Sequence, residues 1–365
     1  MDVPSLVLQL APATSIIDFI HQIPNWPSLS AQEELCKMLT MEHLVRYPPP
    51  AKGYKYLFKC IEKDIISLHS NEDSVFDSDD LFSETFMEMM VEAQTSVVDA
   101  DNSGYLSFKS VLLPGVYVPI KVIQSHNQVG TKVWGAGVFL GELLQYKTNL
   151  LAGQIVLELG AGVGITGLLL GRAIPANEQP AKVIMTDFHH EVVDLLAHNV
   201  DINVSAQDPC ILEADLLDWS TVTSSDYLRY NARIMIVADC TYSESGNVNL
   251  VSAFKIFLHT MTSSDNGDNK NTSIKPDLCN ADSMSICDKE AYMLSLVALR
   301  APFILIACTV RSPETFAHFN DLIQNDAELR VVDVTDWAAS CFPEAPVYFY
   351  AEDRSRIKLL CIHLM

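Results

Sequence analysis

The sequence predicts an α/β protein in which a mostly parallel sheet carries helices on both faces and follows a helical N-terminal region. Three observations predict this fold. Apolar runs alternate with helical patterns from residue 151 onward, a glycine-rich turn separates the first run from the first helical pattern, and residues up to about 100 have helical periodicity. Such alternation is typical of parallel strands that are joined by crossover helices and buried on both faces.

The N-terminal region is expected to be helical because apolar residues recur at helical spacing over 52–68 and again over 81–91. Prolines at 24, 27 and 48–50 separate the helical segments, and the polar segment 71–80 is expected to be a loop. We therefore divide the chain into a helical domain, 1–104, and an α/β domain, 105–365. The second domain is expected to begin with two short strands, 111–113 and 116–118, around the Pro114-Gly115 turn.

The α/β domain is expected to contain seven strands with helices between them. The strands are predicted at 155–159, 183–185, 210–212, 234–238, 303–308, 330–334 and 357–364. The helices are predicted at 165–172, 191–202, 248–260 and 315–323. Residues 262–290 are rich in Ser, Asn and Asp, and we expect a disordered insertion there.

The composition narrows the classes of molecule that the protein can bind and the cell compartment in which it works. The 365 residues include 46 acidic and 24 basic side chains, for a formal net charge of −22. Such a charge repels phosphate backbones, so direct nucleic-acid binding is not expected. A basic protein partner would be attracted, although solubility explains the charge equally well. Nine cysteines without paired spacing favour a reducing compartment. No leader or membrane-spanning run is evident, so we expect a cytosolic protein, working as a monomer, without membrane contact.

The glycine-rich turn is the strongest functional signal. The apolar strand at 155–159 includes Glu158 and runs into Gly160, Gly162 and Gly164, and a helical pattern follows. Glycines let backbone N–H groups approach a ligand that a Cβ would block. The turn suits S-adenosylmethionine, but 162–167 also matches the dinucleotide fingerprint. In both cases Asp187, after the next strand, could accept hydrogen bonds from ribose hydroxyls; the simpler alternative is that it caps the following helix.

Two later features favour the methyl donor. Trp219 follows an acid-rich turn, 215–218, that could reach the adenine amino group while the indole covers the ring; the alternative is that Trp219 only packs in the core. Asp239 and Tyr242 follow the strand at 234–238, which places them at the topological switch beside the transferable methyl group. A dehydrogenase has no need of that pair, although Asp239 could also cap the next helix.

Methyl transfer to a lysine needs position, a neutral nucleophile and exclusion of water. A lysine side chain is protonated in water at neutral pH. Asp239 and aromatic groups could guide the charged head into the site, where burial favours loss of the proton. A hydrogen bond to Asp239 or Tyr242 would then aim the lone pair, and the ring faces of Trp134 and Tyr242 could stabilise positive charge.

We expect no metal site. Residues 99–104 imitate the start of a calcium-binding loop, but its twelfth position holds Ser110 where Glu is needed. Cys279 and Cys287 lie in the polar segment without a neighbouring histidine, so a zinc site is not expected there.

Four motifs in this order resemble the seven-strand, class I protein-lysine methyltransferases of the "family 16" type. They are Val133-Trp134-Gly135-Ala136-Gly137, Leu157-Glu158-Leu159-Gly160-Ala161-Gly162-Val163-Gly164, Leu217-Asp218-Trp219 and Ala238-Asp239-x-x-Tyr242. The segments 47–54 and 309–315 are similar to the elongation factor 2 lysine methyltransferases, so the resemblance covers nearly the whole chain.

The resemblance implies a Rossmann-like seven-strand sheet and methylation, to the trimethyl state, of a lysine of elongation factor 2. It implies that Asp239 and Tyr242 face the target lysine and that the N-terminal domain recognises the partner. It also implies contacts to S-adenosyl-L-methionine from Trp134, Gly160, Ala161, Gly162, Asp187, Trp219 and Ala238. Arg311 and Glu314 lie on the substrate side or are structural. The alternatives are a nicotinamide-dependent oxidoreductase and a donor-binding scaffold without catalysis.

Overall fold

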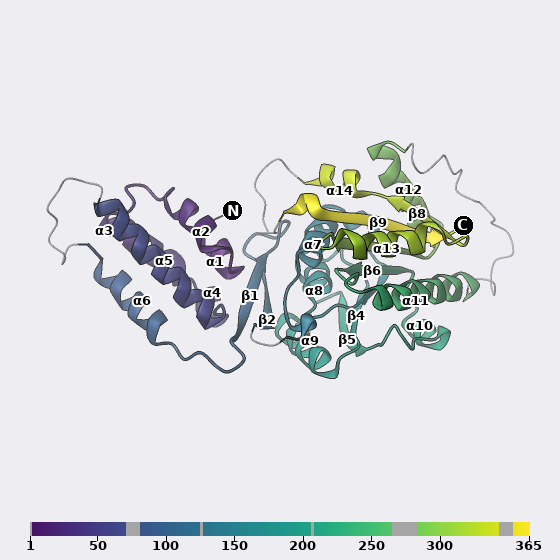
Figure 1. The fold of residues 1–365 in the computed structure, drawn as a ribbon, viewed down its shortest axis with the longest axis horizontal. Helices are drawn as coiled ribbons and strands as arrows, with labels where there is room; N and C mark the ends of the chain where they lie inside the picture. Colours follow the sequence, from purple (N-terminus) through teal and green to yellow (C-terminus); the bar gives the residue numbers. More distant parts are fainter. Residues whose placement is uncertain (1, 71–80, 125–126, 206–207, 265–283, 343–352) are drawn as a thin grey trace. The chain divides into compact units, whose positions relative to one another are not determined.

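The computed structural model describes residues 2–70, 81–124, 127–205, 208–264, 284–342 and 353–365. It divides into two compact units, the first mainly Met1–Lys109 with Pro119–Lys132, and the second mainly Ser110–Val118 with the chain from Val133 onward (Figure 1). Of the described helices, none combines the length and apolar character needed to cross a membrane.

The first unit consists of helices and most of a two-stranded sheet, whose second strand begins in the residues of the second unit. Its helices are α1 (Val3–Leu8), α2 (Ala13–Ile20), α3 (Leu29–Leu39), α4 (Glu42–Arg46), α5 (Ala51–Ser70) and α6 (Glu84–Thr95), and its strands are β1 (Ser103–Lys109) and β2 (Tyr117–Ile123). Helix α5 buries Leu57, Phe58, Ile61 and Ile65, the apolar face that the sequence predicts. Ser83 begins α6 by accepting a hydrogen bond from the N–H of Phe86 at 3.2 Å.

Of the two short strands expected at 111–113 and 116–118, the second overlaps the start of β2, and the first was misplaced. Val111, Leu112 and Leu113 lie in the turn between β1 and β2. The hydroxyl of Ser110 accepts hydrogen bonds from the N–H groups of Leu112 (3.1 Å) and Leu113 (2.8 Å), so a side chain closes this turn in place of a strand partner.

The first unit also ends later than the expected boundary at residue 104, because β1 belongs to it. The Tyr105 N–H donates to the Pro48 carbonyl at 2.9 Å, and a Cβ on Gly104 would lie 2.4 Å from the Pro50 nitrogen. The strand therefore lies against the proline-rich link before α5, which sequence periodicity does not reveal.

The second unit is built on a seven-stranded sheet with the order β5-β4-β3-β6-β7-β9-β8. The first five strands in this order are parallel, and β9 runs antiparallel to both of its neighbours. The strands are β3 (Ile155–Leu159), β4 (Lys182–Asp187), β5 (Ile211–Leu216), β6 (Ile234–Ala238), β7 (Phe303–Thr309), β8 (Leu329–Asp333) and β9 (Ile357–Leu364). The predicted seven-strand α/β sheet is confirmed.

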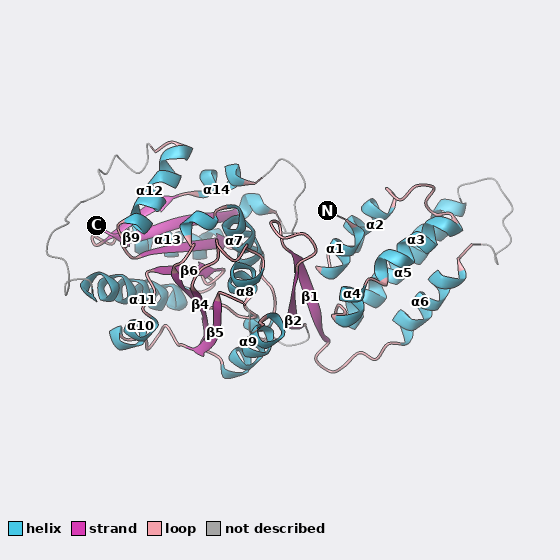
Figure 2. Cartoon of the chain, turned by 180° about the vertical axis from the view of Figure 1, so that it is seen from behind, coloured by secondary structure: helices cyan, strands magenta, loops and turns pink. Residues whose placement is uncertain are grey.

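Helices cover both faces of this sheet (Figure 2). One core joins α10, α11 and α13 to the apolar side chains of the strands, and α7 and α8 pack together and against β6, β7 and β4. The helices are α7 (Gly135–Tyr146), α8 (Ile165–Arg172), α9 (His190–Asn203), α10 (Ser224–Tyr230), α11 (Glu244–Ser263), α12 (Ile286–Ala298), α13 (Pro313–Gln324) and α14 (Thr335–Cys341).

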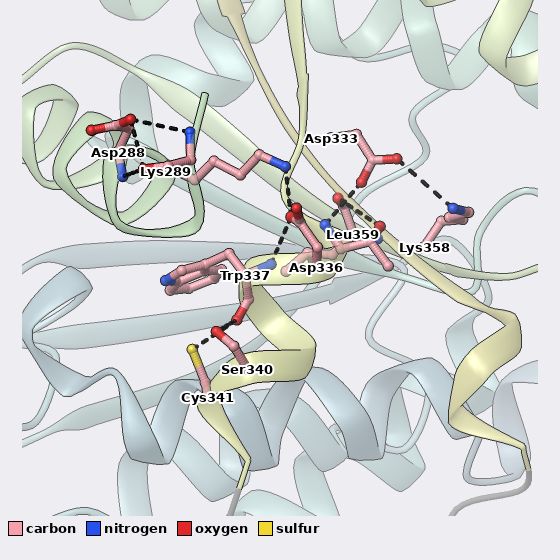
Figure 3. A network of polar contacts seen from close by, with 11 residues as sticks. Asp288, Lys289, Asp333, Asp336, Trp337, Ser340, Cys341, Lys358 and Leu359 are labelled. Atoms are coloured by element: carbon pink, nitrogen blue, oxygen red, sulfur yellow. Dashed lines mark hydrogen bonds and ion pairs between the residues drawn. The ribbon is translucent and has the colours of Figure 1, made fainter. Parts of the chain in front are cut away.

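The ends of the insertion expected at 262–290 are helical. Helix α11 continues to Ser263 and α12 begins at Ile286, while 265–283, which include Cys279, lie outside the described residues. Ser285 and Asp288 form a capping box at the start of α12. Figure 3 shows how this helix is attached: the Lys289 ammonium lies 2.6 Å from the Asp336 carboxylate of α14.

Candidate active site

The glycine turn begins where β3 ends, at the carboxyl edge of the sheet. Gly160, Gly162 and Gly164 have φ angles of 69°, 54° and 85°, which side chains rarely adopt. A Cβ on Gly160 would lie 2.6 Å from the Cys240 sulfur and 2.9 Å from the Trp219 ring. The turn therefore requires glycine for its conformation and for the space around it, as expected of a loop whose backbone approaches a ligand closely.

Glu158 faces into the protein. Its carboxylate accepts a hydrogen bond from the Gly167 N–H at 2.9 Å and so holds the first turn of α8. Burial raises the pKa of Glu158 to about 7, although hydrogen bonds from Thr166 and Gly167 act in the opposite direction. The acid beside the glycines thus supports the turn.

Asp187 joins the glycine turn to the start of α9. Its carboxylate accepts hydrogen bonds from the N–H groups of Gly162 (3.1 Å) and His189 (3.2 Å). Burial raises the pKa of Asp187 against these hydrogen bonds. A carboxylate has about four acceptor positions, so capacity is left for ribose hydroxyls. The carboxylate also binds the amide of His189, the residue that caps α9, so Asp187 contacts the amide before the helix without capping the helix itself. Its role toward ribose hydroxyls stays a prediction.

Trp219 lies beside the glycine turn and is partly buried against the core. The ring of Phe188 lies 6.5 Å from the Trp219 ring and is half exposed, which makes it an aromatic neighbour that the sequence analysis missed. Its position directly after Asp187 was the signal that could have identified it. In the acid-rich turn, Asp215 pairs with Arg229 at 3.0 Å and Asp218 accepts from the Ser220 N–H at 2.8 Å, and a contact of this turn with adenine stays a prediction.

Asp239 is the most highly connected side chain at this edge. Its Oδ1 accepts from the Thr309 N–H at 2.9 Å. Its Oδ2 accepts from the Ala136 N–H (3.1 Å), the Thr309 hydroxyl (3.2 Å) and the Arg311 guanidinium (3.2 Å). The side chain is 4% exposed and the residue has a φ of 54°, a strained conformation that often marks functional sites.

These contacts explain why a carboxylate is needed after β6. Helix α7 begins after Trp134, whose indole offers no acceptor for the first N–H groups of the helix. Asp239 supplies that acceptor from a neighbouring strand, and it also fixes the end of β7 through Thr309. The residue therefore positions the segments around it. It does not cap the helix that follows it, because Ser243 caps that helix.

Among the aromatic residues of the predicted set, Tyr242 is exposed, and Trp134, like Trp219, is partly buried. The Arg311 guanidinium lies 4.8 Å from the centre of the Trp134 ring. Tyr242 is 56% exposed, and its partial burial followed by the nearby Cys240, Asp187 and Asp218 raises the pKa of its phenol.

The structure brings most of the predicted residues to one edge. The ends of β3, β4 and β6 lie side by side, with Leu159 opposite Thr186 on one side and Val237 on the other. Ala238 ends β6, and its carbonyl accepts from the Cys240 thiol at 3.4 Å. The strand ends thus assemble Gly160, Ala161, Gly162, Asp187, Trp219, Ala238 and Asp239.

A groove of about 870 Å³ lies elsewhere, along α11. It is lined by α10, α11, α13 and the turn before β8, and it contains none of the predicted site residues. Its ion pairs, such as Lys255 with Asp326 at 2.9 Å, connect these elements to one another.

Comparisons with known proteins agree with the motifs. A family model described as "Lysine methyltransferase" matches residues 119–264. The bovine Protein-lysine N-methyltransferase EEF2KMT is 26% identical over 251 residues, 63% of this chain and 62% of its own. The human protein of that name is 25% identical over 315 residues, 80% of this chain and 78% of its own. An Arabidopsis thaliana Calmodulin-lysine N-methyltransferase is 26% identical over 132 residues, 36% of this chain and 42% of its own.

The matched part of this chain thus spans less than two thirds of the bovine relative's length, and 41% of the mouse one. The resemblance to lysine methyltransferases that the motifs predict is confirmed.

Proposed function

We propose that this protein is an S-adenosylmethionine-dependent protein-lysine N-methyltransferase and that its substrate is a lysine of elongation factor 2. One observation carries the proposal: the lysine-methyltransferase model covers 119–264, and every predicted site residue from Trp134 to Tyr242 lies within it. The elongation factor is proposed because several relatives bear the EEF2KMT name.

The sheet argues against the nicotinamide alternative. The dinucleotide-binding fold has the strand order 3-2-1-4-5-6. Here β9 is inserted antiparallel between β7 and β8, which adds a seventh strand to that order. Asp239 and Tyr242, which a dehydrogenase does not need, argue against the oxidoreductase and against a scaffold without catalysis.

The residues present fit the donor. The left-handed glycines leave a backbone cradle that a Cβ would fill, and Asp187 beside it retains acceptor capacity for two hydroxyls. Phe188 and Trp219 would bound the adenine, and Trp134 and Ala238 would lie along the rest of the molecule. The bound donor supplies an activated methyl group on a sulfonium ion.

The chain supplies the acceptor side. Asp239 and Tyr242 would receive and orient the target amine, and burial would favour its neutral form. We assign recognition of the partner to the N-terminal unit, 1–104 in the sequence-based division. We also propose a cytosolic location, in keeping with the eight described cysteines, all of which are free thiols. The product is proposed to be trimethyl-lysine.

The test combines donor binding with methyl transfer. Calorimetry should detect S-adenosylmethionine binding, and labelled donor should mark elongation factor 2 on one lysine whose mass increases by three methyl groups. We expect Asp239→Asn to keep most of the donor affinity and to lose transfer by about a hundredfold, the lower range of losses for a group that acts on the reacting atoms. Asp333→Asn, an exposed carboxylate on β8, is the matched control.

Donor binding without any labelled lysine in the elongation factor would reject the substrate. Failure to bind the donor at all, with NADH bound in its place, would reject the activity.

A further inference from the structure

Arg311 occupies a place that is built for a cation. Its guanidinium carbon lies 4.8 Å from the centre of the Trp134 ring, and its Nη2 lies 3.2 Å from Oδ2 of Asp239. An aromatic face opposed to a carboxylate is the combination that attracts ammonium groups as well as guanidinium groups. The three residues come from the start of α7, the end of β6 and the segment after β7, and they meet at the edge of the sheet that carries the glycine turn.

Of the four donors that the structure records on Asp239, Arg311 is the one that can leave. The Ala136 N–H belongs to the first turn of α7, and the Thr309 N–H and hydroxyl belong to the end of β7. Arg311 reaches Asp239 with a long side chain that is 43% exposed. If its guanidinium moved into solvent, the other three hydrogen bonds would remain and the surrounding segments would stay in place.

A second cation cannot simply join the first. Oδ2 of Asp239 already accepts from Ala136, Thr309 and Arg311, and an oxygen of a carboxylate has about two lone-pair positions. Two positive groups beside one carboxylate would also repel each other. An incoming ammonium that is to contact Oδ2 of Asp239 and the Trp134 ring therefore has to replace the guanidinium.

The backbone of this segment is held independently of the Arg311 side chain. The Arg311 N–H donates to the Thr309 carbonyl at 2.9 Å, and the Arg356 guanidinium donates to the Val310 carbonyl at 2.9 Å. Ser312 then caps α13 by accepting from the Thr315 N–H at 3.2 Å. Displacement therefore needs a change of side-chain rotamer and no movement of the strand or the helix.

We propose that Arg311 occupies the position of the acceptor ammonium in the substrate-free protein and that the target lysine displaces it. The proposal rests on the proposed function, in which Asp239 faces the acceptor. It makes Arg311 a specificity-determining residue. A lysine delivered by a docked protein gains additional binding energy from the rest of the interface, so it replaces the guanidinium at a far lower concentration than a small amine in solution does.

Kinetics with Arg311→Ala test the displacement. Loss of an exposed cation–π contact and a half-exposed ion pair should lower the KM for elongation factor 2 by about tenfold. The donor affinity measured by calorimetry should stay within about twofold, because a tenfold change would require about 1.4 kcal/mol that Arg311 does not give the donor. Arg311→Lys should retain most of the wild-type KM. Lys358→Gln, which removes an exposed positive charge from β9, is the matched control.

A fall in KM separates displacement from simple damage, because a disordered segment would raise KM or lower kcat. An unchanged or increased KM in Arg311→Ala, with donor binding intact, would overturn the proposal. So would an equal fall in Lys358→Gln, since the effect would then come from net charge. A shift of the acidic limb of the pH profile without a fall in KM would also overturn it, because Arg311 would then remain in place and act on the proton of the amine.

Side-chain NMR provides a readout that does not depend on transfer. The Nε–Hε signal of Arg311, assigned by its absence in Arg311→Lys, should be shifted by the Trp134 ring current. Titration with n-butylammonium chloride should move it toward the position of solvent-exposed arginines, and neutral n-butanol should not. A signal that stays in place would reject the subsite. Displacement by butylammonium in a protein that methylates no lysine would instead reject the proposed function and keep the subsite.

Discussion

Substitution of Glu158 by Gln isolates the effect of a buried acid on the stability of the glycine turn. The carboxylate accepts from the Gly167 N–H at 2.9 Å, and the neighbouring Thr166 hydroxyl donates to the Gly137 carbonyl at 3.3 Å. A glutamine has the same shape, accepts from Gly167 through its carbonyl, and can donate to the Thr166 oxygen. The variant therefore keeps the local contacts and removes the titration.

The magnitude follows from the pKa. Burial raises the pKa of Glu158 from 4.5 to about 7, so the folded state binds a proton more tightly than the unfolded state. The stability associated with the protonated acid is fully present below pH 4.5 and is lost as pH rises through about 7. The difference in pKa then lowers the free energy of unfolding of wild type by about 1 kcal/mol at pH 5.5 and by about 3 kcal/mol at pH 8.5. The two values differ by about 2 kcal/mol.

Urea denaturation of wild type and Glu158→Gln at pH 5.5 and 8.5 measures this difference. Trp134, Trp219 and Trp337 lie in the α/β unit, so tryptophan fluorescence follows mainly that unit. We subtract the free energy of unfolding of wild type from that of Glu158→Gln at each pH. This difference should be about 2 kcal/mol larger at pH 8.5 than at pH 5.5, in favour of the variant. Glu213→Gln, an exposed carboxylate on β5, should show no such gain. Equal pH dependence in wild type and Glu158→Gln would refute the assignment of a buried, neutral acid.

Three further predictions concern the donor, the acceptor and the partner. Gly160→Ala should weaken donor binding by at least about tenfold in calorimetry, because its Cβ would strain a left-handed residue and lie 2.6 Å from the Cys240 sulfur; unchanged affinity would contradict the cradle. Tyr242→Phe should leave donor affinity within about twofold and lower kcat by about tenfold or more. An unchanged kcat would show that the phenol takes no part in the reaction. Lys59→Glu with Lys63→Glu, on the exposed face of α5, should raise the KM for elongation factor 2 and leave donor binding intact; an unchanged KM would argue against this face of the N-terminal unit.

The strands of the α/β unit could be predicted because their patterns are local. The runs at β3, β6 and β9 are predominantly apolar, as buried strands are, and their bounds agree with the expectation. Helix α8 also matches, since the glycine turn marks its start. In each of these elements the chain neighbours alone define the beginning and the end.

The elements that the sequence analysis placed wrongly are those in which a side chain, and not another backbone group, supplies the hydrogen bonds that decide the local structure. Ser110 closes the β1–β2 turn with its hydroxyl, so the apolar residues at 111–113 do not form a strand. The start of α12 lies in a polar segment without clear periodicity, although the Ser285-x-x-Asp288 capping box could have indicated it. Periodicity therefore failed where a single hydrogen-bonding side chain decided the local structure.

The residues of the candidate site could be predicted better than their contacts. The order of the strands brings β6 beside β7, and this places Asp239 within reach of Thr309 and Arg311. These residues are separated by about seventy positions in the sequence, and their contact depends on a crossover that no local pattern specifies. The sequence analysis therefore predicts that Asp239 faces the substrate, which stays a prediction, and could not identify Asp239 as the acceptor for the start of α7.

The acids at the strand ends hold the site in position before any ligand arrives. Glu158 binds the first turn of α8, Asp187 binds the glycine turn, and Asp239 binds the first turn of α7. Removal of any of these carboxylates by alanine leaves buried N–H groups without an acceptor, so a loss of activity would not separate chemistry from support. An amide at the same position retains one acceptor and loses the charge. The difference between the Asn and Ala variants of Asp239 therefore measures the support that one acceptor gives to α7 or β7. The difference between Asn and wild type combines the loss of the charge with the loss of the acceptor for either the Ala136 or the Thr309 N–H group.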